Sequence, residues 1–536
     1  MSEIKRIRKR AAKAWEYRNR WDLLLRDLYD YVIPYRNAGQ YQTEGNKYTD
    51  KIFDATAIDA AFRFAGRMQQ DVTPPGGSFF ALEPGALFDR AEPEKKKAAA
   101  EEAEHLSKTI HAAISTSDYE TASHEMYLDL FGGTGAMLIL EGDDRRPVRC
   151  LAVAIAELAL ELGPYGDVWG RHWVRSWPGW QLEEMWPDGT FSDALKQQIA
   201  KDPDKPIAIC QSTVWDDKAQ VWRLYVFEHK NETSGPGGGD DAAPIWMSFT
   251  RTSPWITPRF FVVPGESMGR GPGMIALPFV KTINKVAEYD LKAAALALFG
   301  VWTARDDGVF NPRTAKMEPG AIWRVGGNGG ALGPTLSKLD VPGKYDLSRF
   351  ITEEQRQQIN LVTFNRRLPS EAGAVRSPTE IIERVRELDV DMAGVFGRLT
   401  REIIQPTVER VAEILFNKRL IQASFAIDQL SVAMKVVSPV AAAQAAQAAK
   451  PVVDWLTLLG QVAGPQNVPL YADVDEALPD IGRKLGVPEK QIVGPAKRAQ
   501  LRQQMQQQAL MQMMAPKIAA EPPPEDTGPS MNGGAL

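Results

Sequence analysis

The 536-residue chain has little cysteine and no long apolar run, and both absences restrict its class. Its two cysteines, Cys150 and Cys210, have no second thiol near them, which excludes a disulfide-stapled scaffold and fits a reducing cytoplasm. The apolar stretch Leu151–Leu162 is too short to span a bilayer and contains two glutamates. The start, Met1-Ser2-Glu3, lacks the apolar segment of a secretory signal. We therefore expect a soluble protein made in a cytoplasm, without a membrane partner.

The sequence also lacks an excess of positive charge. Its 63 basic and 68 acidic side chains give a formal net charge of −5. Proteins that hold DNA tightly by its phosphates are usually basic, so this balance argues against a repressor-like or polymerase-like binder. It is compatible with a protein past which DNA slides, because every fixed cationic contact would add drag.

Most signatures of catalysis are missing. The absence of G-x-x-x-x-G-K-[ST] excludes a P-loop motor, and without H-E-x-x-H or paired C-x-x-C no zinc site is expected. The acid pairs Asp143-Asp144, Asp240-Asp241 and Asp306-Asp307 fall in turn-like contexts. We interpret them as solvated loops and not as a two-metal nuclease site. No catalytic residue, metal or cofactor is therefore expected.

One catalytic motif does match, because Gly265-Glu266-Ser267-Met268-Gly269 fits G-x-S-x-G. A nucleophile elbow needs a helix immediately after the serine and a histidine later in the chain. Here Arg270-Gly271-Pro272-Gly273 follows, which we expect not to begin a helix at once, and all five histidines lie upstream. We interpret the match as a glycine-rich turn and not as a hydrolase site.

Periodic apolar patterns divide the chain into helical and β-rich regions. At 536 residues it exceeds the roughly 250–300 at which a single core stops growing, so several cores or burial against further copies are expected. A helical start followed by a β-rich stretch (about 135–261) predicts an α+β, mostly helical fold. Helices are predicted over 54–71, 93–116, 276–298 and 352–364, and strands over 221–227 and 245–249.

The longest predicted helix begins at Ser377-Pro378-Thr379-Glu380, a capping box with a favourable proline. Apolar residues then recur at spacings of four and three from Ile381 to Ile403, and the run reaches Phe416. Pro406 lacks a backbone donor and should kink this helix. The remainder is predicted to be helical over 421–515 and disordered over 516–536.

Three lysines deserve separate mention, since Lys281, Lys285 and Lys292 share one face of the helix predicted over 276–298. They could contact the phosphates of passing nucleic acid, or they could simply form the solvent side of an amphipathic helix. Glu288 falls on the same face and dilutes its charge. The two interpretations coincide if that side lines a water-filled channel.

Three segments carry a family resemblance through the order and spacing of their motifs. They are Gly265-Glu266-Ser267-Met268-Gly269-Arg270-Gly271-Pro272 with Lys281-Thr282-Ile283-Asn284-Lys285, then Asp306-Asp307-Gly308-Val309 with Pro319-Gly320-Ala321-Ile322, and finally Thr379-Glu380-Ile381 with Val395-Phe396-Gly397-Arg398-Leu399 and Glu402. Together they resemble the head-to-tail connecting (portal) proteins of short-tailed phages, the podoviruses. The likeness covers about residues 20–420, and residues 421–536 match no motif.

The resemblance implies an elongated portal-type subunit of a dodecameric ring at one capsid vertex. The ring would conduct double-stranded DNA without sequence specificity during packaging and ejection, and would bind terminase and a tail adaptor protein. Major capsid, scaffold and internal core proteins are the further partners implied, in the virion and, during assembly, in the host cytoplasm. The implied regions are a wing (1–270), a first stem helix (271–300), a clip (301–348), a second stem helix (349–366), a tunnel loop (367–377), a long kinked wing helix (378–420), a helical crown (421–515) and a disordered tail (516–536).

The resemblance also implies where DNA would be met, because the family's tunnel loop is the narrowest part of the conduit. The candidate DNA-facing residues are Arg366, Arg367, Arg376, Lys281, Lys285 and Lys292. Such side chains meet phosphates without reading bases. Alternatively, the arginines cap the preceding helix or pair with Glu371 and Glu380. Two competing functions are a capsid or scaffold component without a DNA channel and a DNA-packaging nuclease.

Overall fold

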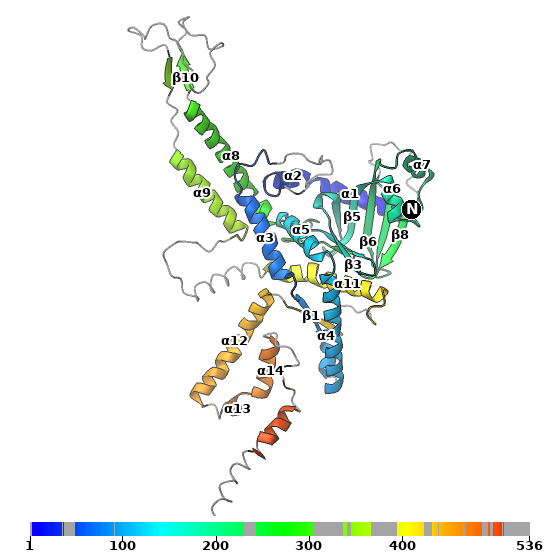
Figure 1. Ribbon diagram of the computed structural model, residues 1–536, viewed down its shortest axis with the longest axis vertical. Helices are drawn as coiled ribbons and strands as arrows, with labels where there is room; N and C mark the ends of the chain where they lie inside the picture. Colours follow the sequence, from blue (N-terminus) through cyan, green and yellow to red (C-terminus); the bar gives the residue numbers. More distant parts are fainter. Residues whose placement is uncertain are drawn as a thin grey trace, which may run out of the picture. The chain divides into compact units, whose positions relative to one another are not determined.

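The computed structural model separates into two compact units, Met1–Ser438 and Pro439–Leu536 (Figure 1). The residues that the structure describes are 3–34, 36, 49–90, 92–229, 243–299, 301–304, 336–339, 345–365, 394–422, 431–437, 439–464, 467–484, 491, 493, 497–505 and 507–508.

Several predicted features lie outside the described residues. They are the acid pairs Asp240-Asp241 and Asp306-Asp307, most of the clip, the arginines Arg366, Arg367 and Arg376, the capping box at Ser377 and the C-terminal tail.

Helices form much of the first unit, and several of them pack into one main core. The helices before the β-rich stretch are α1 (Glu3–Asn19), α2 (Asp22–Tyr31), α3 (Thr56–Val72), η1 (Ala86–Arg90), α4 (Pro93–Ser115) and α5 (Tyr119–Gly132). Leu28 of α2, Met68 of α3 and Phe131 of α5 are all buried in this core. In α3 the buried residues recur at helical spacing and form one apolar face, whereas α5 is buried on nearly all sides.

A five-stranded antiparallel sheet, ordered β4-β5-β6-β7-β8, follows these helices. Its strands and neighbouring short elements are η2 (Ile155–Glu157), β4 (Leu158–Leu162), β5 (Val168–Pro178), α6 (Gly179–Met185), α7 (Asp193–Lys201), β6 (Pro206–Asp216), β7 (Val221–Glu228) and β8 (Trp246–Thr250). A small cluster that includes Ile7 and Ala11 of α1 and Cys210 of β6 packs on one face, and the main core includes Ile209 of the same strand. Side chains therefore pack on both faces of the central strands, whereas the edge strand β8 leaves Met247 and Phe249 exposed. The α+β, mostly helical fold class is confirmed.

Besides the β10–β11 ladder described below, the described residues of the first unit form two smaller sheets, and one of them corrects the sequence-based prediction. The three-stranded sheet is ordered β3-β2-β9 and consists of β2 (Met137–Glu141), β3 (Val148–Ala152) and β9 (Trp255–Ile256). In the other, β1 (Phe80–Pro84) pairs with β12 (Val432–Val436), from Phe80↔Val436 to Pro84↔Val432. The prediction of a wholly helical segment from residue 421 was therefore wrong here. The alternation Val432-Ala433-Met434-Lys435-Val436 suits a strand, and its partner lies far back in the chain.

The region after the sheets holds two long helices joined through a short ladder. α8 (Pro272–Phe299) leads to β10 (Val301–Ala304), and β11 (Leu336–Leu339) precedes α9 (Tyr345–Val362). A helix does begin within Arg270-Gly271-Pro272-Gly273, since α8 starts at Pro272, but it does not follow Ser267 at once. Proline suits a first helical position because the backbone donor it lacks has no partner there.

The predicted interruption of the later helix takes the form of a π-helical turn. Residues 394–399 are helical, η3 (Thr400–Ile404) is the π-helix, and α11 (Gln405–Asn417) follows. The backbone N–H of Gln405 donates to the carbonyl of Thr400, five residues earlier. The next residue, Pro406, has no N–H to offer, so the widened turn lies where the α-helical bonding pattern breaks.

The second unit contains α12 (Pro439–Val462), α13 (Val468–Tyr471) and α14 (Val474–Lys484), with α12 packed against α14. Leu459 of α12 and Ile481 of α14 are buried. Within the described part of the chain, no helix combines the length and the apolar character that crossing a membrane requires.

Candidate functional site

Helices α8 and α9 form an antiparallel pair within the first unit (Figure 1). The chain leaves the end of α8 into β10, pairs with β11 from Val301↔Leu339 to Ala304↔Leu336, and returns along α9. The hydroxyl of Ser348 on α9 donates to a carboxylate oxygen of Asp290 on α8. The order of helix, small β-ladder and helix agrees with the periodicity of the sequence.

The glycine-rich turn before α8 lies directly on the C-terminal end of α5. Gly133, which ends α5, has a φ of +125°, a conformation that favours glycine. A Cβ atom on Gly271 would lie 2.2 Å from the carbonyl oxygen of Phe131, and one on Gly269 would lie 2.4 Å from that of Gly133. The backbone N–H of Gly269 donates to the Thr134 hydroxyl at 2.8 Å. These glycines therefore allow two backbones to touch, which accounts for the motif without a catalytic serine.

The same turn is fixed by Arg270. Its backbone and that of Phe261 exchange two hydrogen bonds, of 2.8 and 3.0 Å. Its guanidinium donates to both carboxylate oxygens of Glu266, at 2.9 and 2.7 Å, and lies 5.1 Å from the ring centre of Trp21. The beginning of α8 is thus held from both sides.

A polar anchor ties the bases of both helices to the segment before α3. The side-chain oxygen of buried Asn284 accepts hydrogen bonds from the backbone N–H groups of Phe53 (2.7 Å) and Asp54 (3.1 Å). The carboxylate of Asp54 in turn pairs with Arg356 of α9 at 2.8 Å. Burial alone would raise the pKa of Asp54, but hydrogen bonds from Thr56 and Arg356 outweigh it and hold that pKa below its ordinary value.

Sequence reasoning did not single out this anchor. Asn284 belongs to the motif Lys281-Thr282-Ile283-Asn284-Lys285, and its position among apolar helix positions is the available signal. An amide on the buried face of a helix needs partners, so it indicates a backbone segment packed against it. Asp54 offered no comparable signal, because its partners lie 230 and 302 residues away.

The three predicted lysines divide into two groups. Lys281 forms an ion pair with Asp27 of α2 at 2.5 Å. Lys285 and Lys292 both pair with Glu288, at 2.8 and 2.6 Å, and remain more than half exposed. The two lysines lower the pKa of Glu288 to about 2, so this carboxylate stays ionised between them. The structure thus brings Lys285 and Lys292 together around one carboxylate and directs Lys281 to the N-terminal helices.

Ser267, the serine of the G-x-S-x-G match, lines a surface cavity together with Glu161. Glu161 contacts the Nε2 atom of His172 at 3.4 Å, and the Nδ1 atom of this buried histidine lies 2.9 Å from the Ser212 hydroxyl. Both ring nitrogens of His172 are therefore engaged, and it is not placed to act as a base for Ser267.

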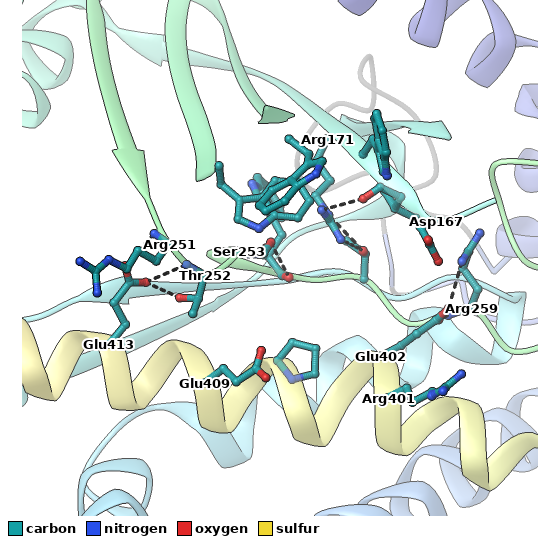
Figure 2. A pocket seen from close by; sticks show the side chains of 17 residues that line it. Asp167, Arg171, Arg251, Thr252, Ser253, Arg259, Arg401, Glu402, Glu409 and Glu413 are labelled. Atoms are coloured by element: carbon teal, nitrogen blue, oxygen red, sulfur yellow. Dashed lines mark hydrogen bonds and ion pairs between the residues drawn. The ribbon is translucent and has the colours of Figure 1, made fainter. Parts of the chain in front are cut away.

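A second cavity, of about 680 Å³, lies between the five-stranded sheet and the helix formed by η3 and α11 (Figure 2). The helix contributes Arg401, Glu402, Glu409 and Glu413. The opposite side contributes, among others, Asp167, Arg171, Arg251, Arg259, Trp215 and Trp222. Within the described residues, no group of three or more histidine, cysteine or acidic side chains is suited to hold a metal ion.

Two carboxylates of this helix fasten it to the segment between β8 and α8. Glu402 accepts from the backbone N–H of Arg259 at 2.7 Å and from its guanidinium at 3.0 Å. Glu413 accepts from the backbone N–H groups of Arg251 (2.8 Å) and Thr252 (3.1 Å) and pairs with Arg410 at 2.9 Å. Figure 2 shows both carboxylates pointing from the helix toward that segment.

Comparison with known proteins gives one match over most of the chain. The family model described as bacteriophage head to tail connecting protein matches residues 4–493. No curated protein matches the chain significantly.

Solved structures with some likeness come from gene transfer agent (GTA) particles. A chain of the neck of an empty GTA particle computed with C6 symmetry is 10% identical, with 84% of this chain and 96% of that chain covered and a TM-score of 0.32. A chain from the virion of the native GTA particle is 11% identical, with 87% and 99% covered and a TM-score of 0.32. A chain of the neck of the native particle computed with C12 symmetry is 11% identical, with 86% of this chain and 99% of that chain covered and a TM-score of 0.30.

Proposed function

This chain belongs to the bacteriophage head-to-tail connecting protein family, and we propose that it is the portal subunit of a virion. Twelve copies form a ring at one capsid vertex, and double-stranded DNA passes through the ring during packaging and ejection. The protein acts as a structural component and catalyses no reaction.

The observation that carries the proposal is the α8–α9 pair. It is anchored through Asn284 and Arg356 and carries exposed apolar side chains along its length. Tyr289 and Leu291 of α8 are 58% and 59% exposed, and Phe350 of α9 is 68% exposed. Tyr289 and Leu291 are two positions apart and so face different sides of α8, which gives the helix pair apolar contacts on more than one side. In a ring, the neighbouring copies of the same pair cover them.

The arrangement of the lysines suits a conduit rather than a clamp. Lys285 and Lys292 share Glu288, so these three side chains together carry a net charge of +1 per subunit. Each phosphate neutralised by a free cation strengthens DNA binding and makes it more dependent on salt. Partly neutralised lysines therefore meet passing phosphates weakly, which permits sliding. Arg366, Arg367 and Arg376 are proposed to meet DNA in the channel loop.

The partners follow from the same assignment. Terminase and then a tail adaptor dock at the β10–β11 end of the helix pair, in the clip. Major capsid, scaffold and internal core proteins contact the remaining regions, the last of these at the helical second unit. Assembly takes place in the host cytoplasm.

The ring is tested on the purified full-length chain by light scattering and negative-stain imaging. We expect rings near twelve subunits, with eleven or thirteen as occasional variants. A stable folded monomer at micromolar concentration would contradict the proposal, and metal-dependent cleavage of DNA by that monomer would favour a nuclease.

A matched pair of substitutions tests the contact surface. Tyr289→Asp places a charge among the exposed apolar side chains of the helix pair and should reduce the yield of rings. Tyr165→Asp makes the same change at a 90% exposed loop position and should leave the yield unchanged. Equal ring yields for the two variants would show that the α8–α9 pair is not where subunits meet.

A further inference from the structure

The cavity between the sheet and α11 is lined by charged side chains of both signs, and two of its arginines, Arg171 and Arg259, are buried. Four arginines and four carboxylates line it. Of the carboxylates, Glu402 and Glu413 are engaged by the backbone N–H groups and side chains already described. Asp167 is exposed to solvent. Glu409 is half-buried, and Glu402 is paired with Arg259. Among the described residues no carboxylate forms a hydrogen bond or ion pair with the buried Arg171.

Arg171 of β5 is the clearest case. It is 9% exposed, and its guanidinium donates to the Thr257 hydroxyl, at 3.2 Å from both Nε and Nη2, and to the carbonyl of Val168 at 3.2 Å. These acceptors are neutral, so its charge is not neutralised by them. Burial and, after it, the neighbouring Arg259 lower the pKa of Arg171 to about 9, although the charge of Glu402 acts in the opposite direction. A buried cation without an anion is costly, and such groups are usually paired.

Arg259 adds a second buried guanidinium to the lining of the cavity. It is 6% exposed, and its Nη1 and Nη2 atoms donate to the carbonyl of Gly166 (3.3 Å) and to Glu402 (3.0 Å). Its buried Nε atom has no hydrogen-bond partner among the described residues. Buried polar atoms without partners are rare, so each needs a reason.

Tryptophan side chains complete the lining. The guanidinium of Arg171 lies 4.7 Å from the ring centre of Trp222, whose ring centre is 5.3 Å from that of Trp215. Stacking on Trp222 fixes the plane of the guanidinium and leaves its edge for hydrogen bonds. Cavities of this size and mixed lining are typical of ligand sites.

We propose that this cavity is a binding site for an oxyanion, a phosphate or carboxylate group that accepts hydrogen bonds from Arg171 and Arg259. Arg401, which also lines the cavity and is exposed, attracts the anion from the solvent side. Its lining includes none of the residues proposed above to meet DNA, terminase or the tail adaptor. It lies where η3 and α11 meet the sheet, so an anion bound there would stabilise that junction.

The test measures the thermal stability of the full-length protein against increasing sodium phosphate, with sodium chloride at matched ionic strength as the reference. We expect the melting temperature to rise saturably with phosphate, with a dissociation constant on the order of 1 mM, as befits a few charge-assisted hydrogen bonds. Sodium acetate is the second arm. A response to phosphate alone identifies a phosphate ligand, and an equal response to acetate identifies a carboxylate.

Substitutions separate a site from a general ionic effect. Arg171→Met should abolish the phosphate response and should leave the melting temperature in chloride unchanged or higher, because it removes an unpaired buried charge. Arg401→Gln, at an exposed position, should keep the fold and weaken phosphate binding about tenfold. Arg145→Gln, at an exposed loop position away from the cavity, is the matched control and should behave as the wild type.

Three results would overturn the proposal. One is a melting temperature that follows ionic strength alone, whichever anion is present. Another is a phosphate response that Arg401→Gln and Arg145→Gln weaken equally. The third is a folded Arg171→Met protein with an undiminished phosphate response, which would assign Arg171 to the fold alone.

Discussion

The contact between the glycine turn and α5 gives the sharpest test of how α8 is held. Gly271→Ala would add a Cβ atom 2.2 Å from the carbonyl oxygen of Phe131, 2.4 Å from the backbone nitrogen of Gly133 and 2.6 Å from the carbonyl carbon of Gly132. All three atoms belong to backbone and cannot rotate away. Ordinary van der Waals contacts begin near 3.4 Å, so the two backbone segments must separate by about 1 Å.

The cost follows from that separation. Overpacking of this kind costs about 1–3 kcal/mol, and loss of the hydrogen bond from Gly269 to the Thr134 hydroxyl adds about 1 kcal/mol. A total of about 2–4 kcal/mol corresponds to roughly a 30-fold or larger increase in the opening equilibrium of the first turns of α8. Hydrogen–deuterium exchange over residues 272–284 measures this opening directly.

The chain offers a matched control at Gly66 in α3. This glycine is exposed, and a Cβ atom there would meet nothing within 4 Å. Gly66→Ala should therefore stabilise α3 by up to about 1 kcal/mol and leave exchange over 272–284 unchanged. If Gly271→Ala exchanged no faster than Gly66→Ala in that segment, the close approach of the two backbones would not be what seats α8.

Three further predictions concern the anchor, the helix contact and the channel loop. Asn284→Ala should cost about 1–3 kcal/mol by leaving the N–H groups of Phe53 and Asp54 without an acceptor, whereas Thr282→Ala at an exposed position on the same helix should change urea denaturation little. Burial alone would raise the pKa of Glu413, but hydrogen bonds from Thr252 and the N–H of Arg251, together with the charge of Arg410, lower it overall. The stabilisation that ionised Glu413 gives is therefore present above about pH 4.5 and is lost as the pH falls through the lowered pKa. Glu413→Gln should destabilise the protein at pH 7 and reduce the loss of stability on acidification. Urea denaturation midpoints measured at pH 7 and below about pH 4.5 test both effects. Arg366→Ala with Arg367→Ala should spare ring assembly but increase the share of empty or partly filled heads, and normal full heads would assign these arginines to the fold.

Local patterns in the sequence were enough to place most helices and several strands. The apolar periodicity of α3 and α4 and the aromatic run of β7 each depend on residues within one element. The strand β12 could not be predicted in this way, because Val432–Val436 is short and its pairing partner is β1. A run of five residues becomes a strand only when a distant edge accepts its hydrogen bonds.

The candidate sites depend even more on contacts between distant parts of the chain. Arg171 stands in the run Val168-Trp169-Gly170-Arg171-His172, where a charged residue reads as the solvent side of a strand. It is buried because β5 is an inner strand of the sheet and because η3 and α11 lie beside it. The glycines of the turn before α8 were likewise visible as a motif, but their reason is contact with Gly133, more than a hundred residues earlier. Long-range packing decides both cases, and no local pattern encodes it.

The last prediction tests whether the lysines of α8 face DNA in the proposed conduit. Glu288 neutralises part of their charge. Glu288→Gln would leave Lys285 and Lys292 without their shared carboxylate and would add one positive charge per subunit. If these lysines face the channel, DNA should be held more tightly, binding should become more dependent on salt, and packaging should slow. Glu354→Gln, at an exposed position of α9, makes the same charge change and is the control. The measurement is the packaging rate and its salt dependence for heads built with each variant. Equal rates and equal salt dependence for the two variants would place Lys285 and Lys292 away from the DNA and leave them as the solvated side of the helix.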